Sequence, residues 1–343
     1  MRDLSRHNPQ RILVRTTNWI GDAVMTTPAL RAIRETFPSS HITIVANPLV
    51  AQLFECHPDC NEVMVFDKKA EHAGWLGFLR FVSMLRQKKF DCAILLQNAV
   101  EAAIISFLAG ISNRAGYTTD GRGILLTHPV PIGDRERALH HTDYYLHMLS
   151  QCGVTTTAKR QTLALSPEEV EWAARQMPLG RYAVINPGAA YGAAKRWIPE
   201  RFAAVADELA DSYGLPIVLS GGLAEVEIGR DIARAMRTAS LNVIGETNVR
   251  QMMAILAASY LMVTNDSGPM HVAAAFGVPI VAIFGPTDHT TTSPWGSRAR
   301  IVRHPVECSP CLLRQCPIDH RCMQRVTVAD VMSAVADVLG AGV

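Results

Sequence analysis

The feature that most constrains the fold is the alternation of short apolar runs with longer helical patterns along the whole chain. This alternation is typical of a parallel sheet that is covered by helices. In the first half, strands are expected at 11–15, 41–46, 62–66 and 92–96, and helices at 23–36, 48–55 and 75–88. In the second half, strands are expected at 182–186, 216–220, 242–244, 260–264 and 279–284, and helices at 199–213, 224–237, 249–257, 270–276 and 328–339.

The length predicts two domains, because 343 residues exceed what one ordinary core accommodates. The polar, Thr-rich segment 152–167 is the candidate linker, which gives domains 1–160 and 161–343. The helix expected at 328–339 can pack on either domain. Ligands of such sheets bind beyond the carboxyl ends of the strands, so we expect the functional site in a central cleft between the domains.

Charge and cysteine usage exclude several classes of protein. The formal net charge of +2 argues against a nucleic-acid partner. Residues 1–165 carry 18 basic and 14 acidic residues (net +4), and the remainder carries 15 and 17 (net −2). A basic first half suits an anionic partner, although ordinary surface variation explains it equally well. No secretion signal is recognisable, so we expect a cytoplasmic protein whose eight cysteines need not form disulfides.

The segment 264–271 reads as the end of a strand, a turn and the start of a helix. Pro269 suits the first helical turn, and the unpaired N–H groups at a helix start bind phosphate or pyrophosphate. The candidate binding residues of this turn are Asp266, Ser267, Gly268 and His271, of which the first and last could also contact a sugar.

A second strand–turn–helix unit contains the sequence from Thr16 to Asp22. Asp22 is a candidate general base that takes a proton from an attacking sugar hydroxyl. An N-cap of the following helix is an equally good interpretation of this residue. Asn18 and Gly21 lie in the same turn and are candidate binding residues.

The Gly- and Ala-rich stretch from Asn186 to Trp197 follows another predicted strand. Small residues such as Gly188 allow close approach of a ligand to the backbone. Lys195 could neutralise a leaving diphosphate, and Arg196 could act likewise. A solvated loop with Trp197 buried in a core is the alternative.

Glu225 follows the predicted strand at 216–220 and could bind both hydroxyls of a ribose. A helix N-terminal acid that is favoured by the helix dipole is the alternative. Glu227 competes with it for the same role.

Four cysteines lie within fifteen residues, with His304 and His320 beside them: Cys308, Cys311, Cys316 and Cys322. The spacing is compatible with a metal site, with partly buried free thiols, or with a redox-sensitive loop. The sequence lacks the motifs of P-loop kinases, dinucleotide-dependent dehydrogenases and α/β-hydrolases. It also lacks any Asp-x-Asp pair, which argues against a metal-dependent sugar transferase.

Three blocks together resemble the bacterial ADP-heptose lipopolysaccharide heptosyltransferases, and in particular their heptosyltransferase II branch. They are Asn18 to Asp22, Tyr191 to Trp197 and Asn265 to His271; the cysteine segment from Cys308 to Cys322 adds to the resemblance. It spans nearly the whole chain, and the combination of blocks is specific although each block alone is not.

The resemblance implies an α/β GT-B fold of two Rossmann-like domains, with the acceptor bound by the first and ADP-heptose by the second. It implies inverting, metal-independent transfer of L-glycero-D-manno-heptose to the first heptose of the lipid A–Kdo inner core, without a cofactor. By this comparison Asp22 is the base, and Lys195 meets the diphosphate. Glu225 meets the ribose, and the 266–271 turn meets the diphosphate and heptose.

The acceptor of such an enzyme is anionic and membrane-embedded, so we expect reversible contact with the cytosolic face of the inner membrane. Lys68, Lys69, Arg114 and Arg122 are candidate contacts to the acceptor, although each could be an ordinary surface charge. Two other functions stay open at this point. One is another GT-B transferase or a nucleotide-sugar epimerase, and the other is a nucleotide-sugar sensor without catalysis.

Overall fold

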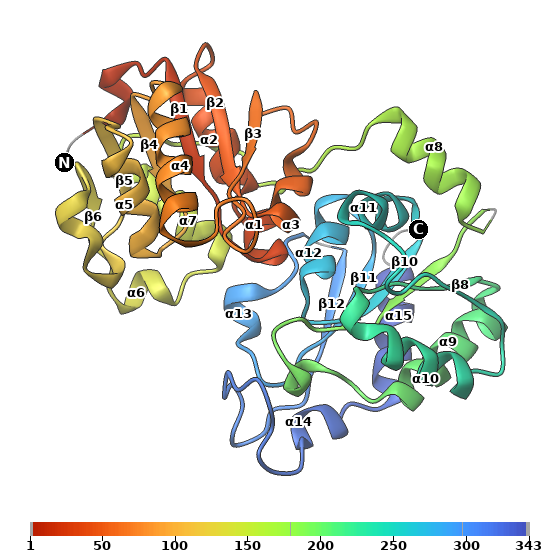
Figure 1. Ribbon diagram of the computed structural model, residues 1–343. Helices are drawn as coiled ribbons and strands as arrows, with labels where there is room; N and C mark the ends of the chain where they lie inside the picture. Colours follow the sequence, from red (N-terminus) through yellow and green to blue (C-terminus); the bar gives the residue numbers. More distant parts are fainter. Residues whose placement is uncertain (1–2, 179, 297, 341–343) are drawn as a thin grey trace. The chain divides into compact units, whose positions relative to one another are not determined.

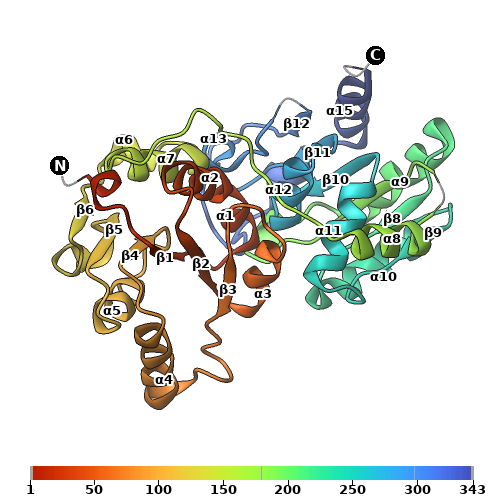
Figure 2. The same ribbon diagram turned by 90° about the horizontal axis from the view of Figure 1, so that it is seen from above.

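The computed structural model describes residues 3–178, 180–296 and 298–340 and consists of two compact units. Unit 1 is Met1–Ala164 and unit 2 is Leu165–Val343. Each unit contains one parallel sheet with helices packed against it (Figures 1 and 2). We describe each unit by itself.

The sheet of unit 1 has the strand order β3-β2-β1-β4-β5-β6, and all its neighbouring strands are parallel. Ile12 of β1 lies opposite Ile42 on one side and Cys92 on the other. The order reverses between β1 and β4, which is the switch point of a doubly wound sheet. The strands are β1 (Arg11–Arg15), β2 (His41–Ala46), β3 (Glu62–Val65), β4 (Cys92–Leu95), β5 (Asn113–Tyr117) and β6 (His128–Val130).

The helices of unit 1 cover an apolar core that includes Leu13, Val45, Phe81, Leu85 and Leu95. The α-helices are α1 (Ile20–Met25), α2 (Thr27–Thr36), α3 (Pro48–Ala51), α4 (Gly74–Gln87), α5 (Val100–Leu108), α6 (Asp134–Arg137) and α7 (His141–Ser150). Short 3₁₀ turns are η1 (Leu4–His7), η2 (Gln52–Phe54) and η3 (Thr119–Leu125).

The sheet of unit 2 repeats this arrangement with the order β12-β11-β10-β7-β8-β9, again with parallel neighbours. Its switch point lies between β7 and β10. The strands are β7 (Ala183–Asn186), β8 (Ile217–Leu219), β9 (Ser240–Asn242), β10 (Leu261–Asn265), β11 (Ile280–Ile283) and β12 (Ala299–Val302).

The helices of unit 2 begin and end at recognisable signals. Ser166 and Asn248 form capping boxes at the starts of α8 and α11, and Gly214, with φ of 63°, ends α9. The elements are α8 (Pro167–Gln176), η4 (Ala193–Lys195), α9 (Pro199–Tyr213), η5 (Leu223–Glu225), α10 (Val226–Ala235), α11 (Val249–Ala258), α12 (Gly268–Ala275), α13 (His289–Thr292), α14 (Arg321–Gln324) and α15 (Val328–Gly340). The last helix packs on α9, β11 and β12 of this unit and buries Val331, Val335 and Val338.

The predicted α/β fold class with two doubly wound Rossmann-like sheets is confirmed. Several local expectations are wrong or incomplete. The helix predicted from residue 23 begins at Ile20 and is interrupted at Thr26, and the strand expected at 242–244 lies at Ser240–Asn242. Helices α5, α7 and α8 were not predicted, nor were strands β5, β6 and β12. Those strands were missed because Gly, Pro and Arg interrupt their apolar pattern. Among the described residues, no helix has the length and apolar character needed to cross a bilayer.

The segment expected to be a linker packs largely against unit 1. Val154 is buried, and Gln161 Nε2 donates a hydrogen bond to Thr142 Oγ1 at 3.0 Å. The backbone N–H of Thr162 donates to Thr27 Oγ1 at 3.1 Å. Its polar, Thr-rich composition therefore reflects hydrogen bonds to the surface of unit 1.

Candidate active site

Two asparagines are the last residues of the central strands of unit 2, and their side chains hold the loops that follow these strands. Asn265, the last residue of β10, accepts a hydrogen bond from the Trp197 backbone N–H (3.0 Å) and donates one to the Pro187 carbonyl (2.7 Å). Asn186, the last residue of β7, donates to the Ser220 carbonyl at 2.7 Å. The loops after β7, β8 and β10 are thereby held at one edge of the sheet. A polar residue at the end of an apolar strand was the sequence signal that we did not use.

Lys195 and Asp266 form a partly buried ion pair at this edge. The Nζ and Oδ2 atoms are 2.6 Å apart, and the two side chains are only 14% and 5% exposed. Thr287 Oγ1 donates a second hydrogen bond, also of 2.6 Å, to the same carboxylate oxygen. Lys195 was predicted from its Gly- and Ala-rich loop and from the family resemblance. The structure attaches it to the 264–271 turn, 71 positions away in sequence.

The cysteine segment lies directly against the loop that carries Lys195. The Arg314 carbonyl accepts a hydrogen bond from the Ala194 N–H at 3.0 Å, and His320 Nε2 donates to the Ala194 carbonyl at 2.7 Å. Gly192 is needed here, because a Cβ atom on it would lie 2.3 Å from the Arg314 carbonyl oxygen. Lys195 Nζ also lies 5.0 Å from the centre of the Tyr191 ring. This segment therefore sets the position of the lysine loop.

The four clustered cysteines are free thiols in this structure. Burial, and then the neighbouring thiols of the segment, raise the pKa of Cys322 above its ordinary value. Within residues 3–178, 180–296 and 298–340, no three His, Cys, Asp or Glu side chains are grouped as a metal ion requires.

The predicted anion-binding turn lies at the N-terminus of α12. Ser267 occupies the N-cap position, but its side chain does not cap the helix; Oγ lies 3.1 Å from Thr264 Oγ1 and 3.4 Å from Asn186 Oδ1. The first N–H groups of a helix have no acceptor within the helix, so those of Gly268 and Met270 can bind an anion. His271 is buried in the first turn at 3% exposure.

The structure separates the two competing glutamates. A Cβ atom on Gly188 would lie 1.9 Å from Glu225 Oε1, so the Glu225 carboxylate lies directly on the Gly188 backbone. Its other oxygen accepts a hydrogen bond of 2.7 Å from the Gly222 N–H, and burial raises the pKa of this carboxyl group. Glu227 is exposed and pairs with Arg230 at 2.5 Å. Glu225 is thus the glutamate at the edge of the sheet. Through its hydrogen bond with the Gly222 N–H it also caps the start of the 3₁₀ turn η5.

In unit 1, Asp22 lies inside α1 and is not its N-cap. The cap position belongs to Trp19, so the N-cap interpretation of Asp22 is wrong. Asp22 Oδ1 lies instead 3.1 Å from Nδ1 of His141, the first residue of α7, although 119 positions separate the two in sequence. Gly21 is buried beside it, and the Asn18 carbonyl accepts a hydrogen bond of 2.9 Å from Asn47 Nδ2. No pattern in the sequence pointed to His141.

The four cations expected to contact the acceptor differ in their surroundings. Lys68 is exposed and pairs with Glu101 at 2.7 Å, and Lys69 is exposed. Arg114 donates to the Leu125 carbonyl at 2.6 Å, and it lies over the ring of Phe107. For Arg122 the prediction of a surface contact is wrong. Its side chain is completely buried and binds the carbonyls of Tyr117 and Gln97, and burial lowers its pKa to about 10.

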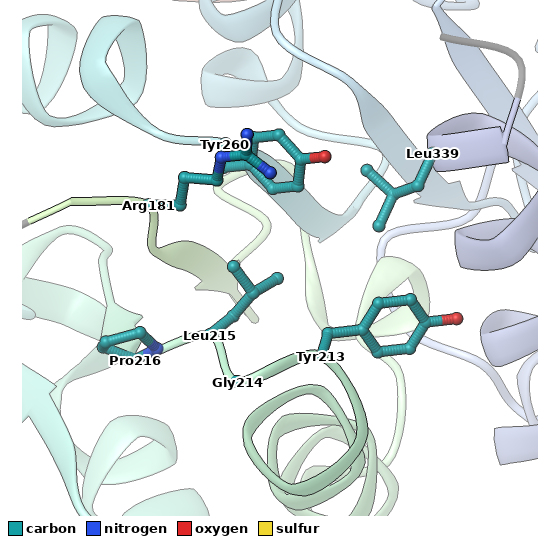
Figure 3. A pocket seen from close by; sticks show the side chains of 7 residues that line it. All are labelled: Arg181, Tyr213, Gly214, Leu215, Pro216, Tyr260 and Leu339. Atoms are coloured by element: carbon teal, nitrogen blue, oxygen red, sulfur yellow. The ribbon is translucent and has the colours of Figure 1, made fainter. Parts of the chain in front are cut away.

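A cavity of about 500 Å³ lies at the opposite end of the unit 2 sheet (Figure 3). Arg181, Pro216 and Tyr260, which line it, lie one or two residues before the first residues of β7, β8 and β10, so the cavity is at the amino ends of the strands. The guanidinium of Arg181 lies over the Tyr260 ring, 4.7 Å from its centre. This cavity contains none of the candidate residues, and we do not assign the donor site to it.

Comparisons with known proteins identify the family of the chain. The chain is 32% identical over 308 residues to lipopolysaccharide heptosyltransferase 2 of Escherichia coli K12, covering 85% of this chain and 88% of that protein. The structure of E. coli ADP-heptose lipopolysaccharide heptosyltransferase II is similar, with a TM-score of 0.82 and 27% identity over 96% of this chain and 99% of that one. A family 9 glycosyl transferase from Veillonella parvula gives a TM-score of 0.88 with 26% identity, covering 97% and 98% of the two chains. The sequence model of glycosyltransferase family 9 (heptosyltransferase) matches residues 78–321, and the chain belongs to that family.

Proposed function

We propose that this glycosyltransferase moves L-glycero-D-manno-heptose from ADP-heptose to the first heptose of the lipid A–Kdo inner core. The transfer inverts the configuration of the sugar and uses no metal ion. The observation that carries the proposal is the partly buried ion pair between Lys195 of η4 and Asp266, which lies between β10 and the N-terminus of α12. It places a cation and helix N–H groups together, as a leaving diphosphate requires. The names of the relatives support the donor and the lipopolysaccharide acceptor.

The donor half of the reaction is assigned to unit 2. The N–H groups at the start of α12 bind the diphosphate, and the ammonium group of Lys195 stabilises the charge that develops on it. Asp266 keeps the lysine in position, and with His271 it contacts the heptose. The carboxylate of Glu225, which lies against the buried backbone of Gly188, accepts hydrogen bonds from the ribose hydroxyls.

The acceptor half is assigned to unit 1, with Asp22 as the general base. The acceptor oxygen attacks C1 of the heptose while Asp22 takes its proton. The bond from C1 to the diphosphate oxygen breaks, and ADP leaves with the electron pair. Because attack comes from the side opposite the leaving group, the configuration at C1 inverts. The 3.1 Å contact with His141 supports a fixed orientation of the Asp22 carboxylate.

Asn18 and Gly21 lie in the turn beside Asp22 and are assigned to acceptor binding. Lys68 and Lys69 are assigned to the anionic groups of the acceptor. Because that acceptor is anchored in a membrane, the enzyme works in the cytoplasm at the inner face of the inner membrane and binds there reversibly.

The test is incubation of the purified protein with ADP-heptose, with and without mono-heptosylated Kdo–lipid A. Mass spectrometry should find one added heptose only when the acceptor is present, and NMR of the product should show the inverted anomeric configuration. A changed sugar nucleotide without acceptor would instead identify an epimerase. Tight donor binding without turnover would identify a sensor.

A further inference from the structure

Helix α4 presents large apolar side chains to solvent. Trp75 is 69% exposed, Leu76 79% and Leu79 39%. Their spacing of one, three and four positions places them on one face of the first two turns. The opposite face packs into the core of unit 1 through Gly77, Phe81, Val82 and Leu85. A contiguous exposed apolar patch of this kind indicates an interaction site.

Basic residues lie before, within and after the helix that carries this patch. The segment 68–89 contains six Lys or Arg residues and one acidic residue, Glu71. Three of the six are engaged elsewhere: Lys68 with Glu101, Lys88 with Glu62, and Arg86 with the Leu108 carbonyl. The other three, Lys69, Arg80 and Lys89, are also exposed. The surface therefore combines apolar anchors with excess positive charge.

The loop before α4 is held firmly against the helix. A Cβ atom on Gly77 would lie 2.4 Å from the His72 backbone, and the buried His72 ring packs edge-on against Phe81 with centroids 4.9 Å apart. Asp67 Oδ1 accepts hydrogen bonds from the N–H groups of Lys69 and Ala70 at 2.9 and 3.1 Å. The loop that carries Lys69 is thus fixed against the first turns of α4, the helix that Figure 2 shows at the bottom of unit 1.

We propose that this α4 surface, made of Trp75, Leu76, Leu79, Lys69 and Arg80, docks on a bilayer that carries anionic phospholipid headgroups. Tryptophan and leucine insert at the boundary of headgroups and acyl chains, while Lys and Arg bind the anionic surface. This inference deepens the proposed function, on which its biological setting rests, by naming the surface that meets the membrane.

A second copy of the chain fits the α4 surface poorly. A symmetric pairing would bring the same basic residues of two copies together, where they repel. Three apolar side chains also fall short of the roughly 800 Å² that each partner buries in a stable interface. An anionic bilayer satisfies both the charge and the apolar side chains.

The experiment is flotation of the purified full chain with phosphatidylcholine vesicles, with and without phosphatidylglycerol, in the absence of donor and acceptor. We expect binding only to the anionic vesicles, and weaker binding at high salt. The triple change Trp75→Ser, Leu76→Ser and Leu79→Ser should weaken binding at least about tenfold. Lys69→Gln with Arg80→Gln should weaken it about fivefold for each charge removed.

Matched controls change exposed residues of unit 2. Val170→Ser and Leu223→Ser remove apolar side chains that are 55% and 79% exposed, and Arg175→Gln with Arg234→Gln removes two charges. These controls should bind as the wild type does, and circular dichroism should show that all variants are folded.

Three results would overturn the inference: no binding of the wild type to anionic vesicles, equal losses in test and control variants, or a dimer, measured by light scattering, that the α4 changes dissociate. The third would mean an interface between copies. Because the assay contains no substrates, its failure leaves the proposed heptosyl transfer untouched.

Discussion

Replacing Lys195 by Met removes the cation of a buried pair and leaves the Asp266 carboxylate, at 5% exposure, with Thr287 as its remaining side-chain donor. Breaking such a pair from one side costs about 3–5 kcal/mol. Since Lys195 is 14% exposed and Thr287 still donates, we expect a loss near the lower end, about 3 kcal/mol. For a domain of this size that corresponds to a fall in Tm of about 6–12 °C.

A double-mutant cycle isolates the pair. Asp266→Asn in the Lys195→Met background removes the unpaired charge, so the double variant should regain part of the lost Tm, with a coupling energy of about 1–3 kcal/mol. Thermal unfolding followed by circular dichroism without nucleotide is the measurement. Arg230→Met is the control, because it breaks an exposed pair of unit 2 that contributes about 0.5 kcal/mol or less.

The same variant tests catalysis well below its Tm. Loss of charge stabilisation on the leaving diphosphate should lower kcat about 10²–10³-fold, while the affinity for ADP-heptose changes less. If the Tm of Lys195→Met lay within about 2 °C of the wild type, and the Tm of the double variant were also unchanged, the conclusion that this ion pair stabilises the fold would be refuted. An unchanged kcat with weaker donor binding would make Lys195 a plain binding residue.

Asp22→Asn should lower kcat about 10²–10⁴-fold and leave donor affinity intact, as initial rates and ADP-heptose titrations would show; more than a tenth of wild-type kcat would exclude Asp22 as the base. Transfer should survive exhaustive EDTA treatment, and activity restored only by Mg²⁺ or Mn²⁺ would contradict the metal-free mechanism. Burial raises the pKa of Glu225 above its ordinary value of 4.5, so the folded state loses stability as pH rises through the raised pKa. The variant Glu225→Gln should therefore unfold at a higher denaturant concentration than the wild type at pH 8. This difference should vanish below about pH 4.5, where the carboxyl group is protonated in both states. Added salt should raise the acceptor KM and leave the donor KM unchanged, and Lys68→Ala with Lys69→Ala should do the same at low salt; an effect on the donor KM alone would contradict acceptor binding by unit 1.

The sequence predicted the central strands of both sheets well, because buried parallel strands consist of short runs of apolar residues. It also located the turns that follow β1, β7, β8 and β10, since ligand-binding residues in such folds directly follow a strand. Edge strands such as β6, with the sequence His-Pro-Val, carry no such apolar signal. Expectations based on local pattern therefore failed at such strands, and they also missed the helices α5, α7 and α8.

The sequence alone thus determined the fold class and the strand ends where polar residues gather, because both depend on the order of residues over short distances. Only the tertiary structure decided which of these residues meet. It joined Lys195 to Asp266 and Asp22 to His141 across 71 and 119 positions, and it buried Arg122 among backbone carbonyls. It also distinguished Glu225 on Gly188 from Glu227 in solvent, since two positions on a helix point in different directions. Such pairings depend on how separate strands and helices pack, and a pattern read along one segment contains no information about its neighbours in space.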